Sequence, residues 1–174
     1  LKAIGSISGI NQMKIPFNKP GFTGREIKYI ENAISRGHTS GDGVYTAKCS
    51  SLLQNILDTK KVLMTTSCTH SLEMAAILLK IKPGDEIILP SFTFVSTVNS
   101  FVLRGAIPVF ADIRSDTLNI DENQLEKLIT KKTKVIIVVH YAGVGCDMDS
   151  IMQISDKYSI PVVEDNAHGL FGKY

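Results

Sequence analysis

The sequence predicts an α/β fold in which a largely parallel sheet is covered by helices on both faces. Short runs rich in Val, Ile and Leu alternate with amphipathic segments in β-α order. The apolar runs show little polar alternation, which is typical of strands buried on both faces. With 174 residues and 44% hydrophobic content, the chain is long and apolar enough for a sizeable core. No repeat or low-complexity tract interrupts this order.

Strands and helices follow from this pattern. We expect strands at residues 61–65, 86–89, 107–110, 135–139 and 161–164. We expect helices at residues 25–35, 46–57, 71–79, 121–129 and 149–158.

The helices rest on apolar spacing and on start signals. Ile27, Ile30 and Ile34 recur at steps of three and four residues, which places them on one helical face. The turn Gly41-Asp42-Gly43 separates this helix from the next. The third helix follows a cluster of capping residues, the fourth presents Leu125 on an apolar side, and the fifth begins after acidic residues.

Composition excludes several classes of protein. Formal net charge is +2 and the basic residues are scattered, so no nucleic-acid surface is predicted. Cys49, Cys68 and Cys146 are odd in number and widely spaced, which supports neither disulfides nor a metal site. No apolar run approaches the roughly 20 residues that span a bilayer. We therefore expect a cytoplasmic protein with no membrane partner.

Both ends of the sequence are unusual. Residues 1–12 lack a helical or strand period and Met13 resembles a true start, so we interpret 1–12 as a leader or a non-native extension. Residues 171–174 end soon after a strand and its loop, which suggests a truncated chain.

The most informative feature is a carboxylate at a strand end. Asp165 closes the apolar strand that contains Val162 and Val163, and His168 follows three residues later. Open α/β sheets place their ligands at the carboxyl ends of strands, and a buried carboxylate there needs a cationic or hydrogen-bonding partner. A protonated pyridine nitrogen is such a partner. The alternative is that Asp165 caps the next helix or pairs with a surface lysine.

Two further segments follow strand ends. The hydroxyl-rich run 65–71 joins a strand to a helix start, which favours phosphate binding, although a plain run of N-cap residues is the alternative. It lacks the glycines of a nucleotide-binding loop. Phe92 and Phe94 offer rings for a planar ligand, although core packing is the alternative. Together, an anion site, an aromatic ring and a carboxylate match pyridoxal 5′-phosphate (PLP).

Four segments carry a family resemblance. TTSCTHSLEMA, GDEIILPSFTFVSTVNSFVLRGAIPVFADI, VVHYAGVGCDMDSI and VVEDNAH resemble the DegT/DnrJ/EryC1/StrS sugar aminotransferases, a fold type I PLP family. The resemblance runs from Met13 to Tyr174. It implies that residues 13–174 form the N-terminal part of the PLP-binding large domain, which is incomplete in this chain.

The resemblance also implies roles for individual residues. Thr69 and the backbone amide of His70 would bind the cofactor phosphate, and Ser67 and Cys68 would shape the same turn. His140 is expected to be a buried, hydrogen-bonded residue near the cofactor. The implied cofactor-binding set is Ser67, Cys68, Thr69, His70, Phe94, Asp165 and His168.

Three of these residues would contact the ring. Phe94 would stack on it, Asp165 would pair with its nitrogen, and His168 would hydrogen-bond near its phenolic oxygen. Many relatives carry Gln at the position of His168, so histidine marks a subgroup. The Schiff-base lysine of the family lies in a later S-F-H-x-x-K-N segment, beyond Tyr174, so no catalytic residue is expected within this chain.

The implied activity is transfer of an amino group from L-glutamate to the 4-keto carbon of a dTDP-4-keto-6-deoxyhexose, with pyridoxamine phosphate as the carrier. The implied pathway is cell-surface polysaccharide synthesis, namely enterobacterial common antigen or lipopolysaccharide. A homodimer is implied, with the Gly41-Asp42-Gly43 loop as a candidate for a shared site. Two alternatives stay open: a PLP-dependent sugar dehydratase with His at the lysine position, and an inactive truncated product.

Overall fold

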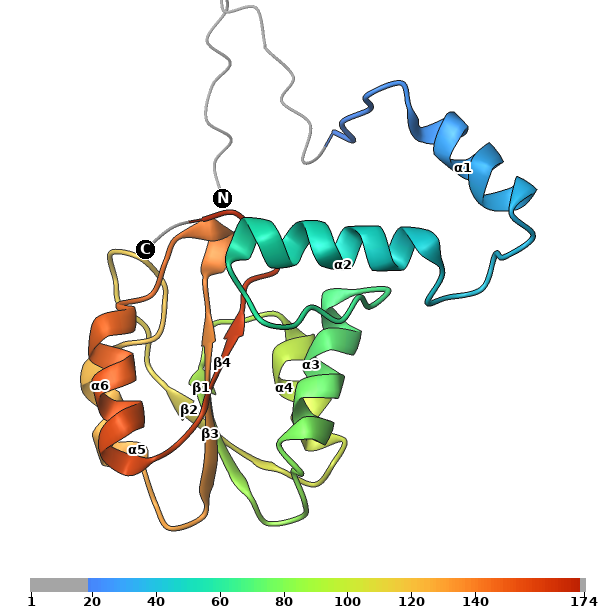
Figure 1. The fold of residues 1–174 in the computed structure, drawn as a ribbon. Helices are drawn as coiled ribbons and strands as arrows, with labels where there is room; N and C mark the ends of the chain where they lie inside the picture. The colour runs from blue at the N-terminus through green and yellow to red at the C-terminus, as the bar shows by residue number, and fades with distance from the viewer. Residues whose placement is uncertain (1–18, 173–174) are drawn as a thin grey trace, which may run out of the picture. The chain divides into compact units, whose positions relative to one another are not determined.

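The computed structural model describes residues 19–172, which form two compact units that meet in sequence between Cys49 and Ser50 (Figure 1). The predicted extension over residues 1–12 and the start at Met13 lie outside the described residues.

The first unit contains helix α1 (Glu26–Ser35) and the beginning of α2 (Val44–Leu57). Both helices were predicted. The Glu26 carboxylate accepts hydrogen bonds from the backbone N–H and the hydroxyl of Thr23, which closes the first turn of α1. No residue of α1 is buried within the described chain, so its predicted apolar face is exposed.

The second unit is built on a four-stranded parallel sheet with strand order β2-β1-β3-β4. These strands confirm four of the five predictions. Their bounds are β1 Glu86–Pro90, β2 Ile107–Ala111, β3 Thr133–Val139 and β4 Val162–Asp165.

The fifth predicted strand, at residues 61–65, is wrong. This segment has no regular secondary structure, and Leu63 and Met64 are exposed. A strand is stable only when its backbone groups pair with a neighbour. Among the described strands, none pairs with this segment, so its apolar residues alone do not make it a strand.

Helices cover both faces of the sheet, as predicted. Figure 1 shows α3 and α4 on one face and α5 and α6 on the other. The prediction omitted α4 and began α3 and α6 too late. The bounds are α3 Cys68–Leu78, α4 Val95–Val102, α5 Glu122–Leu128 and α6 Met148–Tyr158, with a short 3₁₀ helix, η1, at Tyr141–Gly143.

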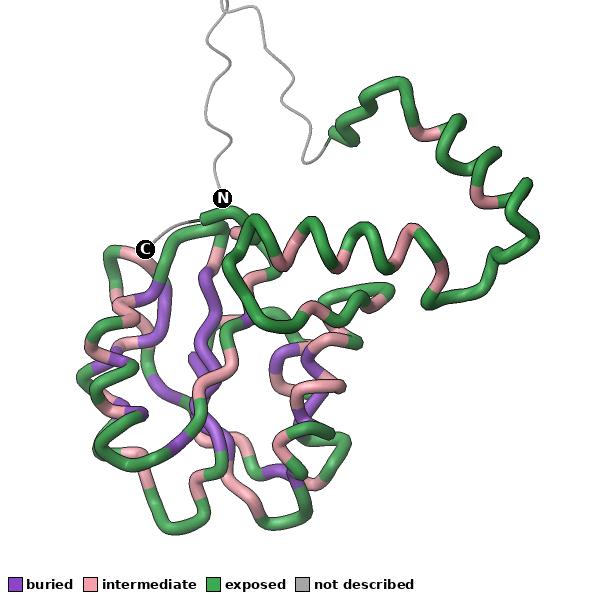
Figure 2. Tube along the Cα trace, viewed as in Figure 1, coloured by how far each residue is buried: buried purple, intermediate pink, exposed green. Residues whose placement is uncertain are grey.

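The core divides at the sheet into two clusters. Alternate residues of a strand point to opposite faces. Ile87 and Ile137 accordingly pack with residues of α3 and α4, whereas Ile88 and Ile136 pack with residues of α5 and α6. Figure 2 shows the buried stretches concentrated along the central strands. This two-sided burial explains why these strands read as continuous apolar runs.

The strand order creates a point at which successive connections leave the sheet in opposite directions. The chain passes from β1 to β2 through α4 on one face, and from β3 to β4 through α6 on the other. The connections that follow β1 and β3 therefore run to opposite faces of the sheet. Open α/β sheets bind ligands at such a point, at the carboxyl ends of the strands.

Candidate functional site

The loops after β1 and β3 meet at the carboxyl edge of the sheet through an aromatic contact. Phe92 lies in the loop after β1 and Tyr141 in the loop after β3, and their ring centroids are 4.5 Å apart. The ring of His168, which follows β4, lies 5.8 Å from Tyr141 in an edge-on arrangement. The segments after three strands thus converge at one place.

Asp165 ends β4 at the same edge and is buried, with 6% of its surface exposed. Its Oδ2 accepts a hydrogen bond of 2.7 Å from the hydroxyl of Thr97 on α4. Its Oδ1 accepts from the thiol of Cys68 at 3.5 Å and from the backbone N–H of Ala167 at 3.3 Å. Hydrogen bonds rather than a surface lysine stabilise this carboxylate.

Cys68 is the first residue of α3, and its thiol is affected by Asp165. Partial burial, and then the negative charge and hydrogen bond of Asp165, raise the pKa of the Cys68 thiol to about 11. At neutral pH the thiol is therefore protonated and acts as a hydrogen-bond donor to the carboxylate.

The start of α3 offers free backbone donors. Ser67 is the N-cap, and its hydroxyl accepts from the N–H of His70 at 3.2 Å. Within the described residues, the N–H groups of Cys68 and Thr69 have no acceptor. The Thr69 hydroxyl donates to that of Ser96 on α4 at 3.0 Å. Free N–H groups at the positive end of a helix form a site for an anion such as phosphate.

The aromatic residues differ in exposure. Phe94 is 68% exposed and immediately precedes α4, whereas Phe92 is 40% exposed and packs on Tyr141. An exposed phenyl ring beside a crevice is available to a planar ligand.

His168 is held by the loop after β3. Its Nδ1 accepts a hydrogen bond of 3.2 Å from the backbone N–H of Ala142. A neutral imidazole that accepts at Nδ1 carries its proton at Nε2, so Nε2 is left as a donor. Gly143, at φ 82°, permits the close approach of the loops, because an added Cβ would lie 3.3 Å from the His168 carbonyl oxygen.

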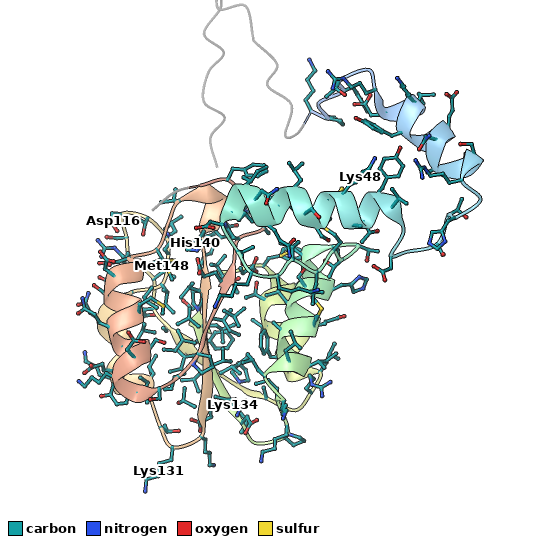
Figure 3. All side chains as sticks on the ribbon, in the orientation of Figure 1. Lys48, Asp116, Lys131, Lys134, His140 and Met148 are labelled. Atoms are coloured by element: carbon teal, nitrogen blue, oxygen red, sulfur yellow. The ribbon has the colours of Figure 1, made fainter. Side chains whose placement is uncertain are left out.

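His140 lies on the other face of the sheet from Asp165. It is buried as predicted, with its Nδ1 accepting from the N–H of Cys146 and its Nε2 paired with Glu164 at 2.9 Å. This hydrogen bond lowers the pKa of the Glu164 carboxyl. Figure 3 shows His140 at the opposite end of β3 from Lys134, at the edge where the site lies. Because Glu164 and Asp165 are neighbours on β4, their side chains face opposite sides of the sheet.

Sequence reasoning missed two residues that contact the predicted set. Thr97 binds Asp165, and Ser96 binds Thr69. Both lie on α4, the helix that was not predicted. The signal that could have revealed them is the presence of hydroxyl residues directly after a strand end and its aromatic loop.

The arrangement fits PLP better than a metal. Among the described residues, no group of three His, Cys, Asp or Glu side chains is placed to hold a metal ion. Asp165 supplies a buried carboxylate, α3 supplies free N–H groups, and Phe94 supplies an exposed ring. These three groups match a protonated pyridine nitrogen, a phosphate and a ring face, respectively.

The chain matches the DegT/DnrJ/EryC1/StrS aminotransferase family over residues 22–174. It therefore belongs to this family. The match includes every predicted cofactor-binding residue.

A similar protein agrees with this assignment. UDP-4-amino-4-deoxy-L-arabinose--oxoglutarate aminotransferase of Shewanella sediminis (strain HAW-EB3) is 37% identical over 160 residues. The match covers 92% of this chain and 41% of that relative, so the chain spans less than half the length of the relative.

Solved structures show the same fold. A protein described as a sugar aminotransferase, Spr1654 from Streptococcus pneumoniae, has a TM-score of 0.82 in its PMP-form, with 34% identity over 89% of this chain and 43% of that one. An aminotransferase from Psychrobacter cryohalolentis has a TM-score of 0.82, with 33% identity over 88% of this chain and 40% of that one.

Within the described residues, no helix is long and apolar enough to cross a membrane.

Proposed function

We propose that this chain supplies the cofactor-binding part of a PLP-dependent nucleotide-sugar aminotransferase. The observation that carries the proposal is the buried carboxylate of Asp165 at the end of β4, held by α3 and α4 beside the free N–H groups of α3. Membership of the aminotransferase family supports the same reaction class.

Asp165 is proposed to pair with the ring nitrogen. When bound, PLP supplies an electron-withdrawing ring that stabilises negative charge on the substrate carbon. Asp165 keeps a proton on the ring nitrogen, because an ionised carboxylate favours the cationic form of its partner. The thiol and hydroxyl donors fix the direction in which this carboxylate faces.

The start of α3 is proposed to hold the phosphate. The free N–H groups of Cys68 and Thr69 would donate to it. The Thr69 hydroxyl donates to Ser96 in this structure, so a bond from this hydroxyl to the phosphate requires it to turn away from Ser96. The N–H of His70, which we predicted as a phosphate ligand, donates to Ser67 in this structure. A phosphate contact by His70 therefore requires this N–H to be shared between two acceptors.

Phe94 and His168 are proposed to complete the ring site. The exposed ring of Phe94 would cover one face of the pyridine, and the Nε2–H of His168 would donate to the phenolic oxygen. A Gln amide offers the same type of donor, which is consistent with Gln at this position in many relatives.

The proposed substrate is a nucleotide-linked 4-keto sugar, with L-glutamate as the amino donor. The name of the Shewanella relative contains a 4-amino sugar nucleotide and oxoglutarate, which supports this chemistry. Sequence resemblance favours dTDP-4-keto-6-deoxyhexose, the substrate of dTDP-4-amino-4,6-dideoxygalactose transaminase of enterobacterial common antigen synthesis. A UDP-linked 4-keto pentose is the competing substrate.

The remaining parts of the site are proposed to come from other polypeptide. The Schiff-base lysine would lie outside residues 1–174, and a second copy of the protein would complete a homodimer. The exposed apolar face of α1 supports an interface in the first unit. The Gly41-Asp42-Gly43 loop is the proposed place of a shared site. A histidine in place of that lysine would instead favour the dehydratase.

The test uses the complete protein. It is incubated with PLP, L-glutamate and either dTDP-4-keto-6-deoxyhexose or UDP-4-keto pentose, and the amino sugar is measured by mass spectrometry. We expect turnover that is faster with the dTDP substrate. Asp165→Asn should reduce the rate on the order of 100-fold while leaving the fold intact. Near wild-type turnover by this variant would show that the cofactor site is elsewhere.

A further inference from the structure

A chain of hydroxyl groups leads to Asp165 from the loop after β1. The Thr93 hydroxyl donates to the Thr97 hydroxyl at 2.9 Å, and the Thr97 hydroxyl donates to Asp165 Oδ2 at 2.7 Å. Thr97 is fully buried and Thr93 is partly buried. The chain thus connects the loop after β1, helix α4 and the end of β4.

The direction of donation is fixed by chemistry. An ionised carboxylate only accepts hydrogen bonds, so the single hydroxyl hydrogen of Thr97 goes to Asp165. Thr97 then has only lone pairs to offer Thr93, which must be the donor of that bond. A hydroxyl that both accepts and donates polarises its neighbours and strengthens each bond.

The acceptor positions of Asp165 indicate that Oδ2 is the oxygen that can bind a further donor. Oδ1 already accepts from Cys68 and from the Ala167 N–H, whereas Oδ2 accepts from Thr97 alone within the described residues. Each carboxylate oxygen accepts about two hydrogen bonds. Oδ2 therefore keeps an acceptor position for a further donor, and Thr97 occupies the other one on the same oxygen.

We propose that Thr97 is a positioning residue that orients the Asp165 carboxylate toward the cofactor ring nitrogen, and that Thr93 holds Thr97 in its donor orientation. This inference rests on the proposed function. Without the Thr97 bond, Oδ2 of this buried carboxylate loses its donor, and the carboxylate is held through Oδ1 alone. The carboxylate is then less well oriented toward the ring nitrogen. It binds the cofactor less tightly, and the ring nitrogen loses its proton more readily.

The experiment compares valine with serine at position 97 in the complete protein. Thr97→Val removes the hydroxyl at similar volume, and Thr97→Ser keeps it. Ser100→Ala is the matched control, because it removes a buried hydroxyl from the same helix that bonds the Ser96 carbonyl rather than Asp165. Two quantities are measured: the dissociation constant of PLP, and the pH at which the ring nitrogen of bound ¹⁵N-labelled PLP loses its proton.

We expect Thr97→Val to weaken PLP binding about 10-fold and to lower the pH of ring-nitrogen deprotonation. Thr97→Ser should restore both values, Thr93→Val should produce a smaller change in the same direction, and Ser100→Ala should change neither. Unchanged values in Thr97→Val, or a higher deprotonation pH, would overturn the inference. Thermal unfolding confirms that each variant is folded.

Asp165→Asn separates this inference from the proposed function. If Asp165→Asn weakens PLP binding and Thr97→Val does not, the role of Thr97 is wrong and the cofactor site stands. If neither variant affects PLP binding, the cofactor site itself is wrong.

Discussion

The thiol of Cys68 lies beside the Asp165 carboxylate, and we expect this neighbour to slow its reaction with alkylating reagents. The thiolate is the reactive form of cysteine, and a pKa of about 11 leaves about one thiol in a thousand ionised at pH 8. In the cofactor-free protein, we therefore expect Cys68 to react slowly with iodoacetamide at pH 8 and its rate to keep rising up to about pH 11.

Peptide mass spectrometry measures alkylation at each cysteine separately, with the exposed Cys49 as the internal control. Asp165→Asn should increase the rate at Cys68, because it removes the negative charge that opposes thiolate formation. A rate at Cys68 that reaches its plateau below pH 9 would contradict the close contact with Asp165.

The two phenylalanines of the loop after β1 should differ in their effect on the cofactor. We expect Phe94→Ala to weaken PLP binding by about 1–3 kcal/mol through lost stacking and burial. Phe92→Ala should affect binding less, because Phe92 packs on Tyr141. PLP titrations of both variants of the complete protein test this ranking, and the opposite order would assign the ring contact to Phe92.

At the scale of elements, the start of α3 depends on its cap. Ser67→Ala removes the acceptor of the His70 N–H and should reduce the free energy of unfolding by about 1 kcal/mol. Ser67→Asn keeps a capping side chain and should reduce it far less. Urea unfolding of the cofactor-free protein measures both. Equal stability of the alanine variant and the wild type would show that the cap contributes nothing.

The elements also show what local sequence can and cannot predict. The strand at 135–139 was predictable because burial on both faces requires continuous apolar residues. Helix α4 was not, because its β-branched and hydroxyl residues favour helix weakly and packing of Thr97 and Phe101 outweighs this preference. The predicted strand at 61–65 was wrong because an apolar run does not form a strand without a neighbouring strand to pair with.

The same distinction applies to the site. Asp165 and the hydroxyl run at 65–71 were predictable, because strand ends and helix starts carry recognisable residues. The contacts of Asp165 with Cys68 and Thr97 were not, because they join positions 97 and 68 residues apart. Such pairings depend on the strand order, which local patterns do not encode.

At the scale of the whole molecule, we expect residues 1–174, expressed by themselves, to bind PLP non-covalently. The family resemblance implies that the Schiff-base lysine lies outside residues 1–174. The described donors to the Asp165 side chain are Cys68, Thr97 and Ala167. We expect borohydride treatment with PLP, followed by intact-mass analysis, to give no stoichiometric adduct. A stoichiometric adduct on one lysine, together with amino transfer to a dTDP-4-keto sugar, would show that the catalytic lysine lies within this chain.

The donors around Asp165 also have a consequence for the order of folding. Cys68 and Thr97 lie on helices that precede β4, and their shared acceptor, Asp165, is the last residue of β4. Contacts between such distant positions form only after the intervening chain has been ordered. During synthesis from the N-terminus, α3 and α4 emerge well before β4. The proposed pocket for the ring nitrogen is therefore completed only when β4 docks, so we expect a nascent chain to bind the cofactor only after β4 has joined the sheet.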